Sequence, residues 1–267
     1  MADIPILLLG AGRLGGALLE GWDLTKAFRP ADLIIRDPQP NDAARAAAAG
    51  GALLNPPDAD LARAATVLLA VKPQVWREAA KDLAPHLGPD AVIVSVAAGV
   101  RAQDISQAFG GRPAARVMPI TAVAIARGAA AVFAPDPRAG RAAHALFDPV
   151  AEVVDLDDEA QMDAVTAVCG SAPAYLYAFV EALEAAGEAE GLSAEASRTL
   201  ARATTAGAAA LLKASGEEPA ELRRQVTSPG GTTQAALEVL MGQGGLGPLL
   251  RRAVAAAADR SRELSKS

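Results

Sequence analysis

A glycine-rich loop near the N-terminus constrains the fold more than any other feature of this sequence. Gly10-Ala11-Gly12-Arg13-Leu14-Gly15 directly follows the apolar run Ile4–Leu9 and opens a stretch with helical spacing. In that context a G-x-G-x-x-G pattern indicates a dinucleotide-binding loop. The first glycine permits a sharp turn, the second admits a pyrophosphate, and the third lets the helix pack on the strand. The alternative is an ordinary glycine turn.

Around this loop, short apolar runs alternate with alanine-rich helical stretches. Runs typical of strands lie at Ile4–Leu9, Leu33–Arg36, Thr66–Val71, Ala91–Val96 and Ala115–Met118. Helical spacing occurs between them at Arg13–Trp22, Asn41–Ala49 and Gln74–Leu83. Continuous apolar strands alternating with helices indicate a parallel sheet covered on both faces. We therefore predict an α/β Rossmann domain, a doubly wound parallel sheet, over residues 1–156.

The pattern changes at about residue 156, after the run Val150–Leu156, and helical signals then dominate. Expected helices are Glu159–Val168 with Asp157 as N-cap, Ala174–Glu190, Ser193–Ala214, Pro219–Gln225, Thr233–Met241 and Leu246–Leu264. These helices carry few large side chains, so a domain of this size would have a thin core unless a second subunit covered it. We predict an all-α dimerisation domain over residues 157–267.

Composition and charge exclude several classes of protein. With 51% hydrophobic residues in 267, the chain is globular and not disordered. A net charge of −6 argues against a nucleic-acid partner. The alanine-rich stretch Ile120–Ala134 is interrupted by Arg127 and Gly128, so no membrane span is expected. The single cysteine, Cys169, fits a reducing compartment. We predict a cytoplasmic protein that holds no metal.

The nicotinamide cofactor is the expected ligand, but its form stays open. Asp37, 22 residues beyond Gly15, is placed to bind the ribose 2′-hydroxyl of NADH, whereas the adjacent Arg36 could bind the 2′-phosphate of NADPH. A solvated Arg–Asp pair is the alternative. Two further segments end predicted strands, where ligands of open sheets collect. The predicted cofactor-binding residues are Leu9, Gly10, Ala11, Gly12, Arg13, Leu14, Gly15, Arg36, Asp37, Ala70, Val71, Lys72, Pro73, Ala97, Ala98 and Gly99.

Three blocks in the second half carry a resemblance to a known family. They are Val226–Leu240, which contains Ser228-Pro-Gly-Gly-Thr-Thr233, Asp163–Thr166 and Gly170–Tyr175. With the glycine loop, they make the chain similar to the pyrroline-5-carboxylate reductases over roughly residues 4–265. The resemblance implies reduction of 1-pyrroline-5-carboxylate, a cyclic imine, to L-proline with NADPH or NADH. It also implies a homodimer interlocked through its helices, often assembled further, with active sites shared between subunits.

The same resemblance implies roles for individual residues. Amides ahead of a helix can hold a carboxylate, and a negative charge near the imine nitrogen would stabilise the iminium that accepts hydride. The implied catalytic residues are Thr233, near the imine nitrogen, and Glu159. The implied substrate-binding residues are Ser228, Gly230, Gly231, Thr232, Thr233 and Thr166. Taken alone, Ser228–Gly231 could be an interhelical turn, and Glu159 could simply offset a helix dipole.

Some positions depart from the family pattern or fall outside it. Ile120 and Ala122 replace an asparagine and a proline that the family commonly has, Ala172 replaces a glycine, and Cys169 replaces a small hydroxyl residue. These departures keep open a reductase of another small cyclic imine acid. A nucleotide-binding scaffold without turnover is a separate alternative. His86 and His144 lie outside every motif, and we predict surface positions for both.

Overall fold

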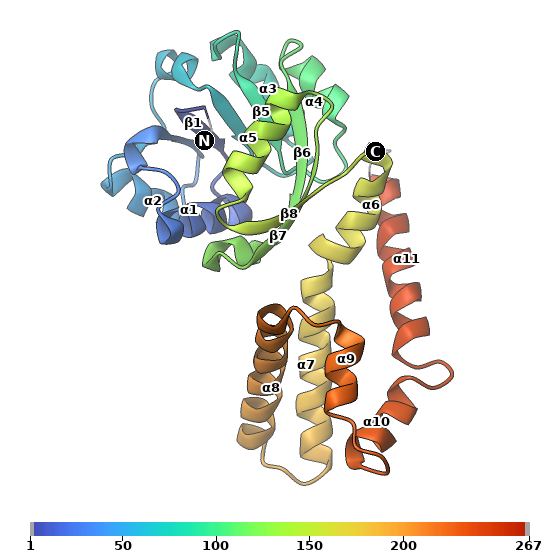
Figure 1. Ribbon diagram of the computed structural model, residues 1–267. Coiled ribbons are helices and arrows are strands. Elements are labelled where there is room, and N and C mark those ends of the chain that lie inside the picture. Colours follow the sequence, from blue (N-terminus) through green and yellow to red (C-terminus); the bar gives the residue numbers. More distant parts are fainter. Residues whose placement is uncertain (1–2, 265–267) are drawn as a thin grey trace. The chain divides into compact units, whose positions relative to one another are not determined.

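A computed structural model describes residues 3–264 and contains two compact units. The first comprises the described residues up to Gly170 together with those from Ala257 onward, and the second is Ser171–Ala256. The domain boundary expected at residue 156 stays a prediction. Of the two predicted domains, residues 1–2 and 265–267 lie outside the described range. Figure 1 shows the elements along the chain.

Within residues 3–264 the first unit holds an eight-stranded sheet in the order β3-β2-β1-β4-β5-β6-β7-β8. The strands are β1 Ile6–Leu9, β2 Leu33–Arg36, β3 Leu53–Leu54, β4 Thr66–Leu69, β5 Val92–Ser95, β6 Ala114–Pro119, β7 Gly128–Phe133 and β8 Ala151–Asp155. All neighbouring strands are parallel except β6 and β7. The predicted Rossmann fold is confirmed, with this one antiparallel pair as a departure from a fully parallel sheet.

The strand β7 was not among the predicted strands. Its sequence, Gly-Ala-Ala-Ala-Val-Phe, has a single β-branched residue and resembles a helix former more than a strand. It becomes a strand because it pairs with β6 on one side and β8 on the other, and Ala130, Ala131 and Val132 are buried. Sheet pairing therefore overrides the local preference of alanine.

Two apolar cores lie on opposite faces of the sheet, because successive side chains of a strand point to opposite sides. Ile6 and Leu8 belong to the core that Trp22 and Phe147 fill from the helices, whereas Leu7 belongs to the core of Phe109. The first core is covered by α1 Arg13–Thr25, α2 Asp42–Ala49 and α5 Pro137–Phe147. The second is covered by α3 Trp76–Leu83 and α4 Ala102–Ala108.

The first unit continues after β8 through short helical turns. They are the 3₁₀ helix η5 Glu159–Gln161, the helix α6 Met162–Val165 and the π-helix η6 Thr166–Gly170. The predicted N-cap Asp157 is wrong by one residue. Asp158 has the extended backbone that a cap needs, and its Oδ1 accepts a hydrogen bond from the Ala160 amide at 2.9 Å.

The second unit is built from helices. They are α7 Ala172–Ala189, α8 Ala194–Ser215, α9 Pro219–Gln225, α10 Thr232–Leu240 and the first part of α11 Leu246–Leu264. Ser193 caps α8 by accepting from the Ala196 amide at 3.2 Å. Among the described residues, no helix is both long and apolar enough to cross a membrane.

Apolar side chains of the second unit are largely exposed. Of the hydrophobic residues in 171–256, all of them described, only Ala201 is buried. Leu176 is 59% exposed, Phe179 46% and Val239 77%. A folded unit that exposes so much apolar surface indicates that another protein surface covers it.

Candidate functional site

The glycine loop lies at the point where the order of the strands in the sheet reverses. Strand β1 stands between β2 and β4, so the chain builds one half of the sheet on each side of it. Gly10 has a φ of +98°, and a Cβ atom there would lie 2.8 Å from the Ala70 carbonyl oxygen. A Cβ atom on Gly15 would lie 2.1 Å from the Gly10 carbonyl oxygen. The chain's own packing therefore requires glycine at both ends of the loop.

Gly12 differs from the other two glycines of the loop. Its φ of −69° is ordinary for any residue, and a Cβ atom there would meet no described atom within 4 Å. Gly12 is also the N-cap of α1, where no side chain of the described residues provides a capping hydrogen bond. The loop thus leaves open space in front of uncapped helix amides, which suits the pyrophosphate of a dinucleotide.

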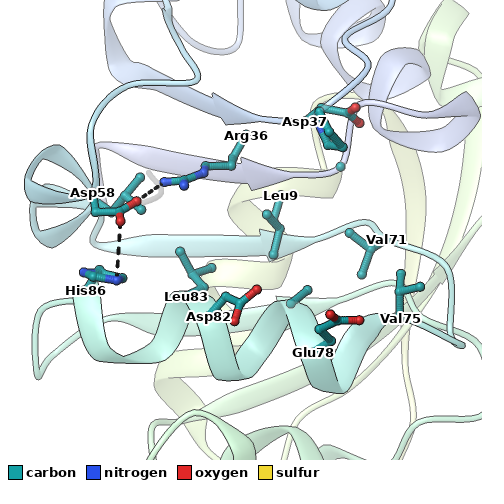
Figure 2. A pocket seen from close by; sticks show the side chains of 14 residues that line it. Leu9, Arg36, Asp37, Asp58, Val71, Val75, Glu78, Asp82, Leu83 and His86 are labelled. Atoms are coloured by element: carbon teal, nitrogen blue, oxygen red, sulfur yellow. Dashed lines mark hydrogen bonds and ion pairs between the residues drawn. The ribbon is translucent and has the colours of Figure 1, made fainter.

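Beside the loop is a cavity of ≈ 720 Å³ at the carboxyl ends of β1, β2 and β4 (Figure 2). Five of the predicted cofactor-binding residues line it: Leu9, Gly10, Arg36, Asp37 and Val71. The other lining residues were not predicted as site residues; they are Pro38, Asp58, Leu61, Val75, Glu78, Ala79, Asp82, Leu83 and His86.

Asp37 is fixed at the edge of this cavity by backbone amides. Its Oδ2 accepts from the Ala11 amide at 2.5 Å, and its Oδ1 accepts from the Gln39 amide at 2.7 Å. Asn55, with a left-handed φ of +49°, holds the backbone of Asp37 through its side-chain amide, at 3.0 Å from the Asp37 nitrogen and 2.9 Å from its oxygen. The carboxylate is therefore held in place by the glycine loop itself.

Arg36 pairs with a different acid from the one beside it. Its Nη1 donates to Asp58 Oδ1 at 2.5 Å, and His86 Nε2 lies 3.6 Å from Asp58 Oδ2. The Arg36 guanidinium, and to a smaller extent His86, hold the pKa of Asp58 below its usual value. His86 is exposed, which confirms its predicted surface position, and it also lines the cavity. No periodic signal linked Asp58 and His86 to this site, because they come from two short 3₁₀ turns.

The other predicted cofactor residues follow the same edge of the sheet. Ala70, Lys72 and Pro73 come after β4, and Ala97, Ala98 and Gly99 come after β5, which pairs with β4. Arg13 and Leu14 open helix α1. These residues do not line the cavity, and their contacts with a cofactor stay predictions.

Glu159 bridges two elements of the first unit. Its Oε1 accepts from the Ala102 amide at 2.8 Å and from Arg116 Nη1 at 2.9 Å. Arg116, on β6, is only 8% exposed, so the carboxylate neutralises a nearly buried charge. The interpretation of Glu159 as a mere dipole charge misses this ion pair. Its catalytic role stays a prediction.

Thr166 and Cys169 lie on the π-helix η6, a type of helix often found at functional sites. The Thr166 hydroxyl donates to the Met162 carbonyl oxygen at 2.8 Å. The Cys169 thiol lies against the carbonyl oxygens of Met118 and Ala129, and burial raises its pKa. The thiol is therefore poorly suited to act as a nucleophile.

In the second unit, the start of α10 presents open amides. Gly230 has a φ of +69° and donates its amide to Gln234 Oε1 at 2.7 Å, while the Gly231 amide donates to the Ser228 carbonyl oxygen at 3.0 Å. Gly231 is the N-cap, and no side chain caps this helix within the described part of the chain. The first-turn amides and the exposed Thr232 form a feature that could hold an anion.

Comparisons with known proteins match both units. A family model for pyrroline-5-carboxylate reductase dimerisation matches residues 159–264, and one for coenzyme F420-dependent NADP oxidoreductases matches residues 5–99. The pyrroline-5-carboxylate reductase of Pseudomonas aeruginosa is 39% identical over 100% of this chain and 98% of that protein. The reductase of Pisum sativum is 35% identical over 99% and 100%. A solved structure of the Coxiella burnetii reductase has a TM-score of 0.90 and 29% identity, covering 99% of each chain.

Proposed function

Because this chain belongs to the pyrroline-5-carboxylate reductase family, we propose that it reduces 1-pyrroline-5-carboxylate to L-proline with NADPH or NADH. It is then an oxidoreductase acting on a C=N bond, and its reaction is the last step of proline biosynthesis. The observation that carries the proposal is Gly12, whose missing side chain serves no described contact of the chain and leaves room for a dinucleotide. The reduced cofactor, a proton and the imine give proline and the oxidised cofactor.

The first unit binds the cofactor. The amides that open α1 hold the pyrophosphate, and the cavity lined by Leu9, Arg36 and Asp37 takes the adenosine end. When bound, the reduced nicotinamide supplies the hydride. The alanines and glycine that follow β5 leave room for a flat ring at the same edge of the sheet.

The second unit binds the substrate carboxylate. The amides of Thr232 and Thr233 at the start of α10, together with the two threonine hydroxyls, supply donors for an anion. Gly231, the N-cap, adjoins them. Thr233 also donates to or accepts from the substrate nitrogen. Ser228, Gly230 and Thr166 complete the substrate-binding set.

Glu159 favours the protonated iminium, which is the better hydride acceptor, through its negative charge. Arg116 and the Ala102 amide both bind its Oε1, and within residues 3–264 the second oxygen keeps lone pairs for a donor. Arg116 also orients the carboxylate through its hydrogen bond to Oε1. Catalysis then depends on positioning and charge, without a covalent nucleophile.

The active form is a homodimer joined through the second unit. The exposed Leu176, Phe179 and Val239 are the surface that a second copy covers, in agreement with the dimerisation model that matches these helices. Assembly of dimers into larger particles is compatible with this surface. The single free cysteine and the net negative charge support a cytoplasmic enzyme without a nucleic-acid or membrane partner.

The test is consumption of NADH or NADPH at 340 nm by purified protein given 1-pyrroline-5-carboxylate. Cofactor-dependent formation of proline supports the proposal. A panel of other small cyclic imine acids is run in parallel, since Ile120 and Ala122 depart from the family pattern. Preference for another imine would show that 1-pyrroline-5-carboxylate is not the main substrate. Tight nucleotide binding without any turnover would favour a nucleotide-binding scaffold protein.

A further inference from the structure

We propose that this chain uses NADH in preference to NADPH, and that Asp58 sets the preference by engaging Arg36. The inference rests on the proposed function and names the cofactor of that same site. Asp58 lies in the 3₁₀ helix η2 Asp58–Arg63 and lines the cavity. Figure 2 shows it beyond Arg36, on the side away from Asp37. It acts as a specificity-determining residue without touching the reacting atoms.

The first argument is that Arg36 is already engaged. Arg36 is the only arginine or lysine among the residues that line the cavity, and its Nη1 donates to Asp58 Oδ1. Because Arg36 holds the pKa of Asp58 low, this carboxylate stays ionised at neutral pH. To bind a 2′-phosphate, the guanidinium would have to leave Asp58 or share itself between two anions. Among the described residues that line the cavity, the only guanidinium or ammonium group is therefore already paired with a carboxylate.

The second argument is the charge of the cavity. Four carboxylates line it, those of Asp37, Asp58, Glu78 and Asp82, against the one guanidinium. The four carboxylates and the one guanidinium together carry a formal charge of −3. Figure 2 shows Glu78 and Asp82 on the α3 side of the cavity, facing the strands. A phosphate monoester brings nearly two more negative charges at neutral pH, about −1.5 to −2, so the cavity repels it.

The third argument is that Asp37 is prepared for a ribose diol. Backbone amides of Ala11 and Gln39 each occupy one of its carboxylate oxygens, and Asn55 fixes its main chain. Each oxygen keeps a second lone pair that can accept a hydroxyl hydrogen. A ribose hydroxyl supplies that hydrogen, whereas a 2′-phosphate would place an anion against an anion.

The experiment measures binding, without substrate, of NADH, NADPH, 5′-AMP and 2′-AMP to the purified full-length protein. We expect NADH to bind at least about tenfold more tightly than NADPH, which is about 1.4 kcal/mol. Raising the salt from about 0.02 M to 0.5 M should narrow that ratio, because salt screens the repulsion. Tighter binding of NADPH by the wild type would overturn the proposal.

The Asp58→Asn variant tests the residue itself. It frees Arg36 and removes one negative charge, so NADPH affinity should rise about tenfold while NADH affinity changes less than about threefold. Asp60→Asn is the matched control, since Asp60 lies on the same turn, is absent from the cavity lining and has no ion pair among the described residues. Thermal unfolding checks that each variant is folded. An unchanged NADH to NADPH ratio in Asp58→Asn would refute the role of Asp58.

These outcomes are separable from failure of the proposed function. If the protein binds NADH selectively but does not reduce 1-pyrroline-5-carboxylate, the substrate is wrong and the cofactor inference stands. If it reduces the imine equally well with both cofactors and binds both equally, the function stands and the inference is wrong. If neither nucleotide binds, both are wrong.

Discussion

The two units of this chain treat apolar side chains in opposite ways. The first unit places Trp22, Phe109 and Phe147 in two cores, each with at most 1% of its surface exposed. The second leaves Leu176 and Val239 more than half exposed, and it buries only small side chains. The first unit can thus account for its own stability, whereas the second needs another surface. The predictions below test this contrast, beginning with the largest expected effect.

Two charges on the exposed face of α7 should break the assembly. In the double variant Leu176→Asp/Phe179→Asp, two unpaired carboxylates would face an apolar partner surface, which costs at least about 4 kcal/mol. That corresponds to about a thousandfold weaker dimer, measured by analytical ultracentrifugation. Nucleotide binding by the first unit should persist. Glu190→Gln, at the exposed end of α7, is the control. A double variant that dimerises as tightly as the wild type would contradict the prediction.

Substitutions at two glycines of the same loop should have different effects, one on folding stability and the other on cofactor binding. Gly15→Ala brings a Cβ atom against the Gly10 carbonyl oxygen and should lower the free energy of unfolding by about 3 kcal/mol. Gly12→Ala should change it by less than about 0.5 kcal/mol, because its Cβ atom enters open space, and should instead weaken NADH binding. Urea denaturation and calorimetry measure the two quantities. Equal losses of stability in the two variants would show that Gly12 has a packing role.

Removing the Thr233 hydroxyl should affect chemistry and leave the nucleotide site intact. We expect Thr233→Val to lower kcat/KM about a hundredfold, with the dissociation constant of NADH unchanged, because Thr233 lies in the second unit. Steady-state kinetics and cofactor titration provide the comparison. Thr233→Ser keeps the hydroxyl and should recover most of the activity. A parallel loss of cofactor affinity would assign Thr233 to another role.

Glu159 can be tested for two roles at once. Glu159→Gln leaves the nearly buried Arg116 without its carboxylate and should lower the free energy of unfolding by about 2 kcal/mol. A catalytic role adds a fall in kcat that persists at temperatures where the variant is fully folded. If stability falls and kcat does not, Glu159 is a structural residue only.

The smallest expected effect is a pH dependence at the edge of the first unit. His144, on α5, has its Nε2 3.0 Å from Asp155 and its Nδ1 2.9 Å from Asp148, and these carboxylates, Asp155 first, raise its pKa above the ordinary 6.5. The imidazolium thus stabilises the fold below pH 6.5, and this contribution is lost as the pH rises through the raised pKa. It amounts to at most about 1 kcal/mol, because the pairs are partly exposed.

The measurement is thermal unfolding of the wild type and His144→Gln between pH 6 and pH 9. The wild type should be the more stable protein at pH 6, and the difference should shrink towards pH 9. A difference that grows with pH would show that the charged imidazole does not stabilise the fold.

Sequence patterns identified most of the first unit because its signals are local. The apolar runs gave β1, β2, β4, β5 and β6, and the glycines marked the loop between β1 and α1. The strands β3 and β7 were not predicted, because β3 has only two residues and β7 is rich in alanine. Their conformation comes from pairing with neighbours, which no window of sequence contains.

The residues of the cavity could likewise be predicted only where they belong to a sequence motif. Gly10, Arg36 and Asp37 carry motif spacing, and the cavity includes all three. Asp58 and His86 do not, because the contact between Arg36 and Asp58 joins residues 22 positions apart through an irregular turn. Helical periodicity likewise predicted the helices of the second unit, but periodicity cannot show which surface covers them.

The bonds around Asp37 have a consequence for how a ligand meets this protein. Its carboxylate reaches the Ala11 amide 26 residues away, and Asn55, 18 residues away, holds its backbone on the other side. These hydrogen bonds connect three segments that are distant in sequence, and they form before a ligand binds. The entropy cost of ordering these loops is therefore met during folding and not when a ligand binds. A substitution at Asn55 should increase the mobility of the Ala11 amide, although the two residues lie in different loops.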